Sequence, residues 1–110
     1  MNWKIQYSAS SREDLKSIFD YIAYELFSPK YASGQVERIM KAVRSLDDMP
    51  MRHPVYSETP WRTKQVRFLT VDNYIIFYLP KDDSGTVNVI RIIYGGRDMK
   101  HQIKETKEEL

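Results

Sequence analysis

Three apolar runs follow one another in the last third of the chain, separated only by gaps of turn length. The runs are Val66–Val71, Tyr74–Leu79 and Val87–Tyr94. The first gap is Asp72-Asn73, which tolerates the left-handed backbone of a tight reversal, and the second is a polar loop that begins with proline and ends with glycine. Strands joined by such short turns must run antiparallel. The pattern therefore predicts a curved, three-stranded antiparallel meander.

Residues 3–7 alternate apolar and polar side chains, which is the period of a strand with one buried face. The segment Ser8-Ala9-Ser10-Ser11 then breaks this period. A serine at this place can accept a hydrogen bond from a free amide of the first helical turn, and such a cap typically stabilises a helix by about 1 kcal/mol. We therefore expect an N-terminal strand followed at once by a helix.

The next part of the chain contains two stripes of apolar residues with the spacing of a helix. Steps of three and four residues in the first stripe join Leu15, Ile18, Phe19, Ile22 and Leu26. Serine followed by proline at positions 28 and 29 marks a new helix start, because proline has no amide to leave unsatisfied there. The second stripe consists of Ala32, Val36, Ile39, Val43 and Leu46. So short a link predicts an antiparallel hairpin that presents both stripes to one sheet.

The segments on either side of the meander are irregular or polar. Residues 50–60 contain three prolines without a clear period, which predicts an ordered surface loop. Gly95-Gly96 ends the last strand, and residues 97–110 suggest a polar helix whose apolar contacts are Met99, Ile103 and Leu110. So small an apolar surface predicts a tail that is frayed or needs a partner. The whole chain, 1–110, is interpreted as one α+β domain, with an N-terminal strand and a helical hairpin packed on one face of a curved antiparallel sheet.

Composition narrows the classes of function. The chain of 110 residues has no cysteine and a formal net charge of +2, so it offers no disulfide, no thiolate nucleophile and no strong electrostatic case for nucleic acid. The first twenty residues lack an apolar signal core, and no run approaches the length of a membrane span. We expect a soluble, cytoplasmic protein that does not enter a membrane.

Basic and aromatic side chains on the predicted sheet are the candidate binding residues. Arg91 lies between Val89 and Ile93 on one face, and an unpaired arginine is costly in a dry interior, so this face is expected to be open at Arg91. If Arg67 projects from the same face, a small basic surface forms with Tyr74 or Tyr94 near its edge. Such a surface suits phosphate or an acidic peptide. The alternative is that these arginines pair with Asp or Glu within the chain.

The sequence offers few candidate residues for catalysis. His53 lies in the proline-rich loop and His101 in the tail, and isolated histidines are more often surface residues than catalysts. The sequence shows neither a paired-carboxylate signature nor a histidine spacing that suggests a metal site. We therefore expect no metal and no cofactor.

The order of the predicted elements, with the segments DLKSIFDYIAYELFSPKYA, VDNYIIFYLP and VNVIRIIYGGRDM, resembles the RelE/ParE superfamily of type II toxin-antitoxin toxins. The resemblance covers nearly the whole chain. It implies a small toxin that is neutralised by a cognate antitoxin, whose extended segment wraps the toxin.

The superfamily has two branches, and the resemblance distinguishes them only by details. RelE-like toxins cleave messenger RNA on the ribosome with basic residues on the middle strands, an arginine after the last strand and often a tyrosine or histidine in the tail. Arg97 matches the arginine after the last strand, whereas Ile75 and Ile103 occupy positions where nucleases carry an arginine and a tyrosine. His101 is the nearby substitute, so a nuclease would use Arg67, Arg97 and His101.

The run from Asn73 to Tyr78 and the proline-started second helix look more like the ParE branch, which poisons DNA gyrase without chemistry of its own. We therefore expect a binding toxin whose Arg67, Arg91, Tyr94 and Arg97 contact the target or the antitoxin. The ribosome and messenger RNA are the alternative target. A non-toxic nucleic-acid-binding or adaptor module is a further alternative.

Overall fold

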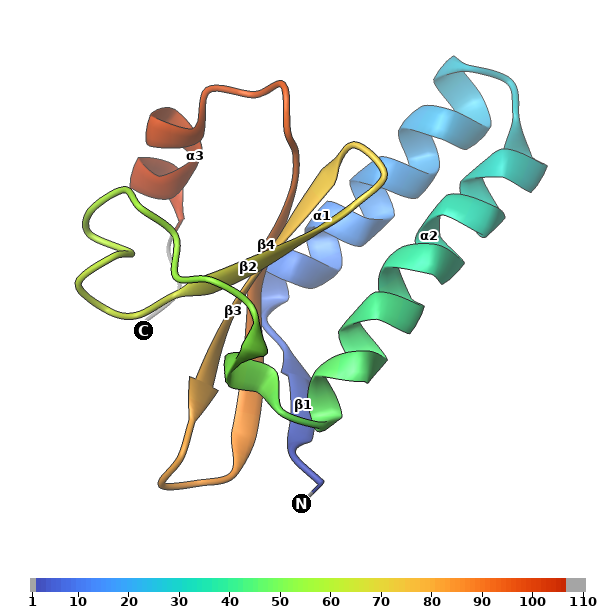
Figure 1. Ribbon diagram of the computed structural model, residues 1–110. Helices are drawn as coiled ribbons and strands as arrows, with labels where there is room; N and C mark the ends of the chain where they lie inside the picture. Colours follow the sequence, from blue (N-terminus) through green and yellow to red (C-terminus); the bar gives the residue numbers. More distant parts are fainter. Residues whose placement is uncertain (1, 107–110) are drawn as a thin grey trace.

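The computed structural model describes residues 2–106, and its single sheet has the strand order β1-β4-β3-β2 (Figure 1). The predicted α+β fold is confirmed. In chain order the elements are β1 (Lys4–Tyr7), α1 (Ala9–Asp20), the π-helical turn η1 (Tyr21–Glu25), α2 (Pro29–Arg44), the 3-10 turns η2 (Ser45–Asp47) and η3 (Pro50–Arg52), β2 (Arg67–Val71), β3 (Tyr74–Lys81), β4 (Thr86–Tyr94) and α3 (Met99–Glu105).

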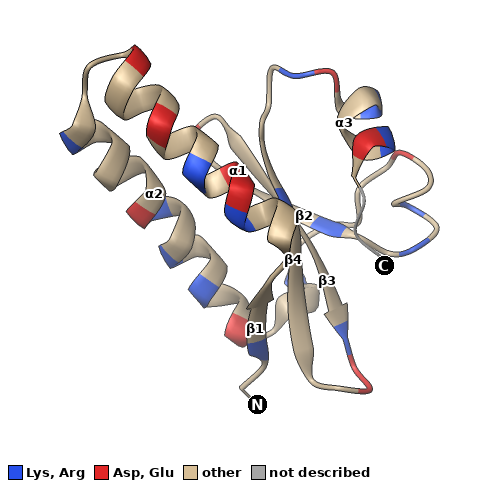
Figure 2. Ribbon diagram, turned by 180° about the vertical axis from the view of Figure 1, so that it is seen from behind, with Lys and Arg blue, Asp and Glu red and all other residues tan. Residues whose placement is uncertain are grey.

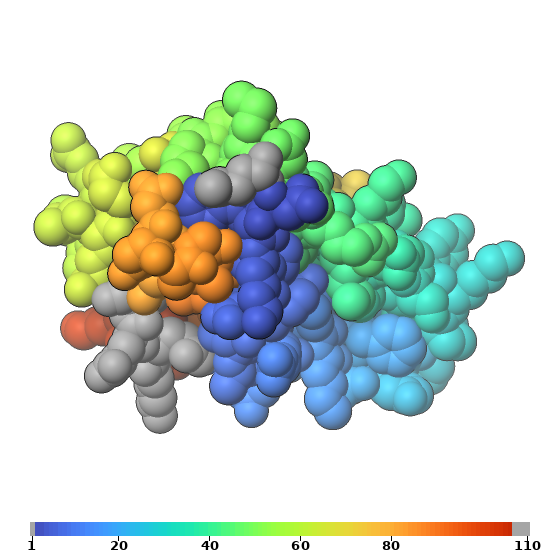
Figure 3. All heavy atoms as spheres, turned by 90° about the horizontal axis from the view of Figure 1, so that it is seen from below, coloured from blue at the N-terminus to red at the C-terminus, as the bar shows by residue number. Residues whose placement is uncertain are grey.

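The sheet contains the predicted meander and one further strand. β2 pairs with β3 and β3 with β4, both antiparallel. β1 lies within the sheet, beside β4 and parallel to it, rather than on the face of the sheet. Seen from below, the N-terminal residues lie between the β3–β4 turn and the helices (Figure 3). The amide of Lys4 accordingly donates to the carbonyl oxygen of Gly85, and that of Trp3 to Asp47.

The helical hairpin covers one face of the sheet, as predicted (Figure 1). Both stripes enter one apolar cluster with sheet residues; its buried members are Ile18, Ile39, Val43, Ile76, Val89 and Ile92. Ser8 is the N-cap of α1, and its hydroxyl accepts a hydrogen bond from the amide of Ser11 at 3.0 Å. Leu26 differs from the prediction: it is exposed, because the π-helical turn at the end of α1 breaks the helical period before it.

The opposite face of the sheet is covered as well, which the sequence did not predict. Residues 54–66 fold back over it, and Trp61 lies 2% exposed against Phe77, with 4.7 Å between the ring centroids. α3 adds Ile103 to the same cluster. The segment predicted as a surface loop therefore leads directly into a second apolar layer, because a single tryptophan does not produce a readable period.

The predicted C-terminal helix is shorter in the structure, where α3 ends at Glu105. Met99 and Ile103 make the predicted apolar contacts. Leu110 lies outside the described residues, so its predicted contact stays a prediction. Among residues 2–106, no helix combines the length and the apolar character needed to cross a membrane.

Arg52 holds the chain after α2 in place through hydrogen bonds to the backbone. Its guanidinium donates to the carbonyl oxygens of Ser45 and Met49, at 3.2 Å each, and to that of Asp48. The next residue, His53, places its ring edge-on to Tyr78, and its buried Nε2 has no hydrogen-bond partner in the described part of the chain. The Tyr78 hydroxyl donates to the carbonyl oxygen of Pro50 at 2.5 Å, and burial raises its pKa to about 12.

We expect the protein to lose stability in acid through His53. Burial of the ring, helped by the nearby Arg52 charge, lowers the pKa of His53 from its ordinary value of 6.5. Below pH 6.5 the unfolded chain therefore binds a proton that the folded chain does not bind, so the free energy of unfolding falls as the pH falls. Urea unfolding of wild type and His53→Phe should diverge over this range, with the variant less sensitive to acid. Identical pH profiles would contradict this assignment.

Candidate functional site

A groove of about 770 Å³ lies between α1 and the end of the sheet where β4 stops. The first helix, the π-helical turn, both central strands, the loop after β4 and α3 all contribute to its lining. The lining residues are Asp14, Ser17, Ile18, Tyr21, Ile22, Leu26, Gln35, Asn73, Tyr74, Arg91, Ile92, Ile93, Tyr94, Arg97 and Gln102. Three of the four predicted contact residues, Arg91, Tyr94 and Arg97, lie here.

Three tyrosines give the groove its aromatic character. Tyr74 and Tyr94 face each other because the β3–β4 register pairs them, and their rings meet edge to face with centroids 5.7 Å apart. Burial raises the pKa of the Tyr74 hydroxyl, and the neighbouring Tyr94, Tyr21 and Asp72 raise it further. Tyr94 is 47% exposed and Tyr21 56% exposed, so both present aromatic surface to a partner.

Gly96 lets the chain turn close against Tyr94. A Cβ atom at this position would lie 2.6 Å from Cε2 of the Tyr94 ring, so any other residue would push the ring away. The turn also directs Arg97, whose amide donates to the carbonyl oxygen of Tyr94 at 3.1 Å. The Arg97 side chain is exposed and forms no ion pair within residues 2–106. It is therefore available to a negatively charged group.

Arg91 is bound within the chain, so the prediction of an open face at this residue is wrong. Its Nε and Nη2 donate to the two carboxylate oxygens of Asp14 at 2.7 and 2.9 Å, and the two side chains are only 14% and 15% exposed. Nη1 donates to Thr106 Oγ1 at 3.1 Å and reaches the carbonyl oxygen of Gln102 at 3.5 Å. Arg91 thus joins α1, β4 and the end of α3, which is the intrachain pairing that the sequence left open.

Asp14 has a second role at the edge of the sheet. β1 pairs with β4 only as far as Val89, which leaves the edge of β4 without a strand beyond that point. The hydroxyl of Ser8 donates to the carbonyl oxygen of Ile90, and the amide of Ile92 donates to the Asp14 carboxylate, both at 2.8 Å. Side chains from α1 and its cap therefore complete the hydrogen bonding of this edge.

Arg67 lies on the other face of the sheet from Arg91. Arg67 pairs with Tyr78 and Arg91 with the adjacent Phe77, and neighbouring residues of a strand point to opposite faces. The Arg67 guanidinium donates to the carbonyl oxygens of Met51 and His53, at 3.0 and 2.6 Å. The surface that would join Arg67 to Arg91 is therefore not formed.

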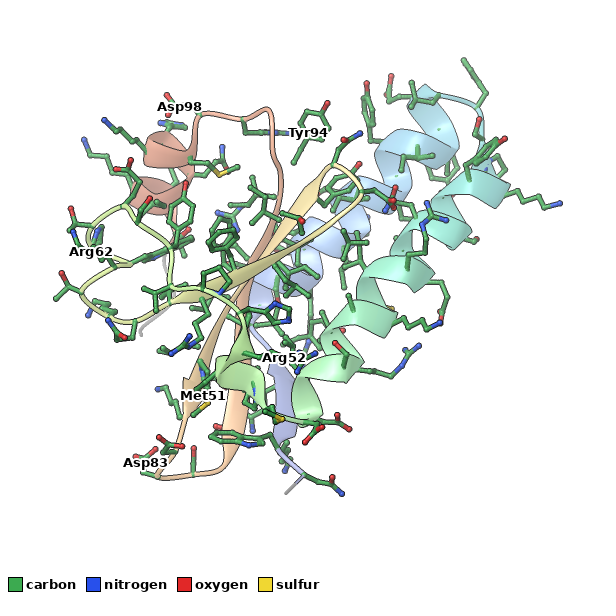
Figure 4. The ribbon with its side chains drawn as sticks, viewed as in Figure 1. Met51, Arg52, Arg62, Asp83, Tyr94 and Asp98 are labelled. Carbon is green, nitrogen blue, oxygen red and sulfur yellow. The ribbon has the colours of Figure 1, made fainter. Side chains whose placement is uncertain are left out.

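His101 comes from α3, whereas Arg67 begins β2. It lies exposed on α3, where its Nε2 is 3.0 Å from Glu105. Figure 4 shows Met51, whose carbonyl oxygen accepts a hydrogen bond from Arg67, well apart from Tyr94. The candidate nuclease residues Arg67, Arg97 and His101 are thus not gathered in one place, and residues 2–106 contain no group of three or more acidic, histidine or cysteine side chains suited to a metal.

The family model for the ParE toxin of the type II toxin-antitoxin system parDE matches residues 5–99. The chain belongs to the ParE toxin family. No curated protein shows significant similarity to this ParE-family chain.

Solved structures show the same fold for this ParE-family chain. A chain of the chromosomal ParDE system from P. aeruginosa is 22% identical, with a TM-score of 0.69 over 84% of this chain and 95% of that one. The RelBE2 toxin-antitoxin complex from Mycobacterium tuberculosis gives 17% identity and a TM-score of 0.59, covering 86% and 92% of the two chains. A mutant of the E. coli toxin RelE in the free state gives 11% identity and a TM-score of 0.65, covering 96% and 95%.

Sequence reasoning missed several groove residues. Nothing in the sequence shows that Asp14 of the first helix reaches β4. The sequence position of Tyr21 likewise does not show that its side chain lines the groove. Gln102 carried no signal at all, because its place depends on how α3 packs. The glycine pair was recognised as a strand end, but its close approach to Tyr94 required the structure.

Proposed function

We propose that this ParE-family toxin stops growth by binding DNA gyrase, performs no chemistry of its own and is neutralised by its cognate antitoxin. The observation that carries the proposal is the separation of its basic residues. A ribosome-dependent nuclease needs several of these groups around one phosphate. In this chain Arg67 and Arg91 serve the fold on opposite faces of the sheet, and among the described residues only Arg97 offers a free positive charge in the groove.

The composition of the groove supports a binding role. Its lining contains isoleucine side chains from α1 and β4, three tyrosines, and Arg97, whose positive charge forms no ion pair within residues 2–106. Apolar and aromatic side chains around one cation are typical of a groove that holds a peptide segment with an acidic residue. We therefore propose Tyr94 and Arg97 as contact residues for the antitoxin or target, with Arg91 holding the groove in shape.

The second candidate is cleavage of messenger RNA on the ribosome. Its support is the position of Arg97 directly after the last strand, together with the fold that the chain shares with RelE. His101 would have to act as the general acid, although it pairs with Glu105 on the exposed side of α3. The two candidate functions differ in their effect on the cell: gyrase poisoning lowers plasmid supercoiling, whereas the nuclease cuts messenger RNA.

Induced expression without antitoxin separates these functions when plasmid supercoiling and messenger RNA integrity are read from the same cells. We expect growth to stop, supercoiling to fall and messages to stay intact. Cut messages with normal supercoiling would establish the nuclease instead. Unimpaired growth from a folded protein would contradict both and leave the adaptor module.

A further inference from the structure

The tip of the helical hairpin carries a cluster of exposed apolar side chains. It extends over η1, the connecting loop and the first turn of α2 (Figure 1). The exposed fractions are 68% for Tyr24, 52% for Leu26, 87% for Phe27 and 77% for Tyr31. We call these four residues the tip patch. Tyrosine and phenylalanine gathered on an exposed surface are typical of protein interfaces, because a lone domain gains nothing from exposing them.

The backbone holds the tip patch in a fixed shape. The amide of Leu26 donates to the carbonyl oxygen of Tyr21 at 3.1 Å, and that of Ser28 to Ile22 at 3.0 Å. Phe27 lies between these bonds with a φ of 53°, a left-handed conformation that is uncommon for a bulky residue. The turn therefore presents Phe27 outward without a further loss of backbone entropy on binding, which favours recognition.

One acid and one base flank the tip patch. Glu25 ends η1 and Lys30 follows the first residue of α2, and neither forms an ion pair within residues 2–106. Acidic and basic residues lie along both arms of the hairpin (Figure 2), and Glu25 and Lys30 are the pair that flanks the tip. A partner of a single charge sign, such as an anionic lipid surface, would match one of them and repel the other. A second copy related by a two-fold axis would place each Glu25 opposite the Lys30 of its partner.

We propose that the tip patch is a self-association surface, through which two copies of the toxin meet hairpin to hairpin about a two-fold axis. Phe27 is the central apolar contact, and two symmetric Glu25–Lys30 pairs fix the orientation. The tip patch is separate from the proposed binding groove, although Leu26 belongs to the tip patch and also lines the groove. The inference does not depend on the toxin's target.

Sedimentation equilibrium of the full chain over a range of concentrations tests the proposal. Wild type should pass from 13.1 kDa to twice that mass as the concentration rises. Phe27→Asn, which keeps a residue that tolerates the left-handed backbone, should weaken the dimer by at least about thirtyfold. Glu25→Lys and Lys30→Glu should each weaken it by about tenfold, because either change turns two attractions into two repulsions.

The double variant Glu25→Lys with Lys30→Glu should regain the wild-type dimer, since the exchanged charges again face opposite partners. Lys100→Glu, a charge reversal on the exposed side of α3, is the matched control and should leave dimerisation unchanged. A wild-type chain that stays at 13.1 kDa at all concentrations overturns the proposal. A dimer that the double variant does not restore, with every variant folded by circular dichroism, overturns it as well.

Discussion

Asp14→Ala should lower the free energy of unfolding by about 3 kcal/mol, the usual cost of removing one partner from a buried ion pair. The change leaves the Arg91 guanidinium without its carboxylate in a place where it is only 14% exposed. It also removes the acceptor for the amide of Ile92 at the open edge of β4. Urea denaturation of wild type and variant measures the loss.

Asp20→Ala is the matched control, since it removes an acid of the same helix that forms an exposed ion pair with Lys16. Its cost should stay within about 0.5 kcal/mol. The double variant Asp14→Ala with Arg91→Met should recover part of the loss, because the buried charge is then gone as well. Equal stabilities for Asp14→Ala and Asp20→Ala would show that the ion pair does not hold the sheet edge.

Tyr94→Ala combined with Arg97→Ala should weaken binding of the toxin's partner at the groove by at least about thirtyfold, since aromatic and arginine side chains dominate interface energies. Neither side chain is buried, so the variant should keep the wild-type melting temperature. Titration of the purified toxin with antitoxin and with gyrase gives the affinities. Growth inhibition in cells then shows whether the loss of antitoxin binding or the loss of gyrase binding changes toxicity.

Arg62→Ala serves as the control for the groove variant, because Arg62 lies on a loop apart from Tyr94 (Figure 4) and does not line the groove. It should bind both partners as wild type does. If the folded groove variant also retains full affinity for both, the groove is not the contact surface. A combined Arg67→Ala and Arg91→Ala variant would not answer this question, since both arginines hold structural elements together.

Local signals were enough to predict the helices and the meander. Proline at position 29, the serines after Tyr7 and the glycine pair after Tyr94 each mark an element end through the chemistry of one or two residues. The apolar stripes of the hairpin then point to one face, as the cluster around Ile39 confirms. These features depend on sequence separations of a few residues, which periodicity detects.

The covered second face and the groove depend on contacts between distant residues. Trp61 packs on Phe77, and Arg91 pairs with Asp14, which is 77 residues away in the sequence. A charge in a strand was expected to require an open face, but a single carboxylate from α1 satisfies it. Sequence reasoning identified Tyr94 and Arg97 as candidates, yet only the packing of α1 and α3 beside β4 forms the groove around them.

A supercoiling assay with purified gyrase tests the proposed function most directly. The toxin is added to gyrase, relaxed plasmid and ATP, and the Tyr94→Ala/Arg97→Ala variant is run in parallel. We expect wild type to block supercoiling and to accumulate cleaved plasmid, and the variant to do neither at the same concentration. Normal supercoiling at saturating toxin, from a preparation that cleaves messenger RNA on ribosomes, would contradict the proposal and establish the toxin as a nuclease.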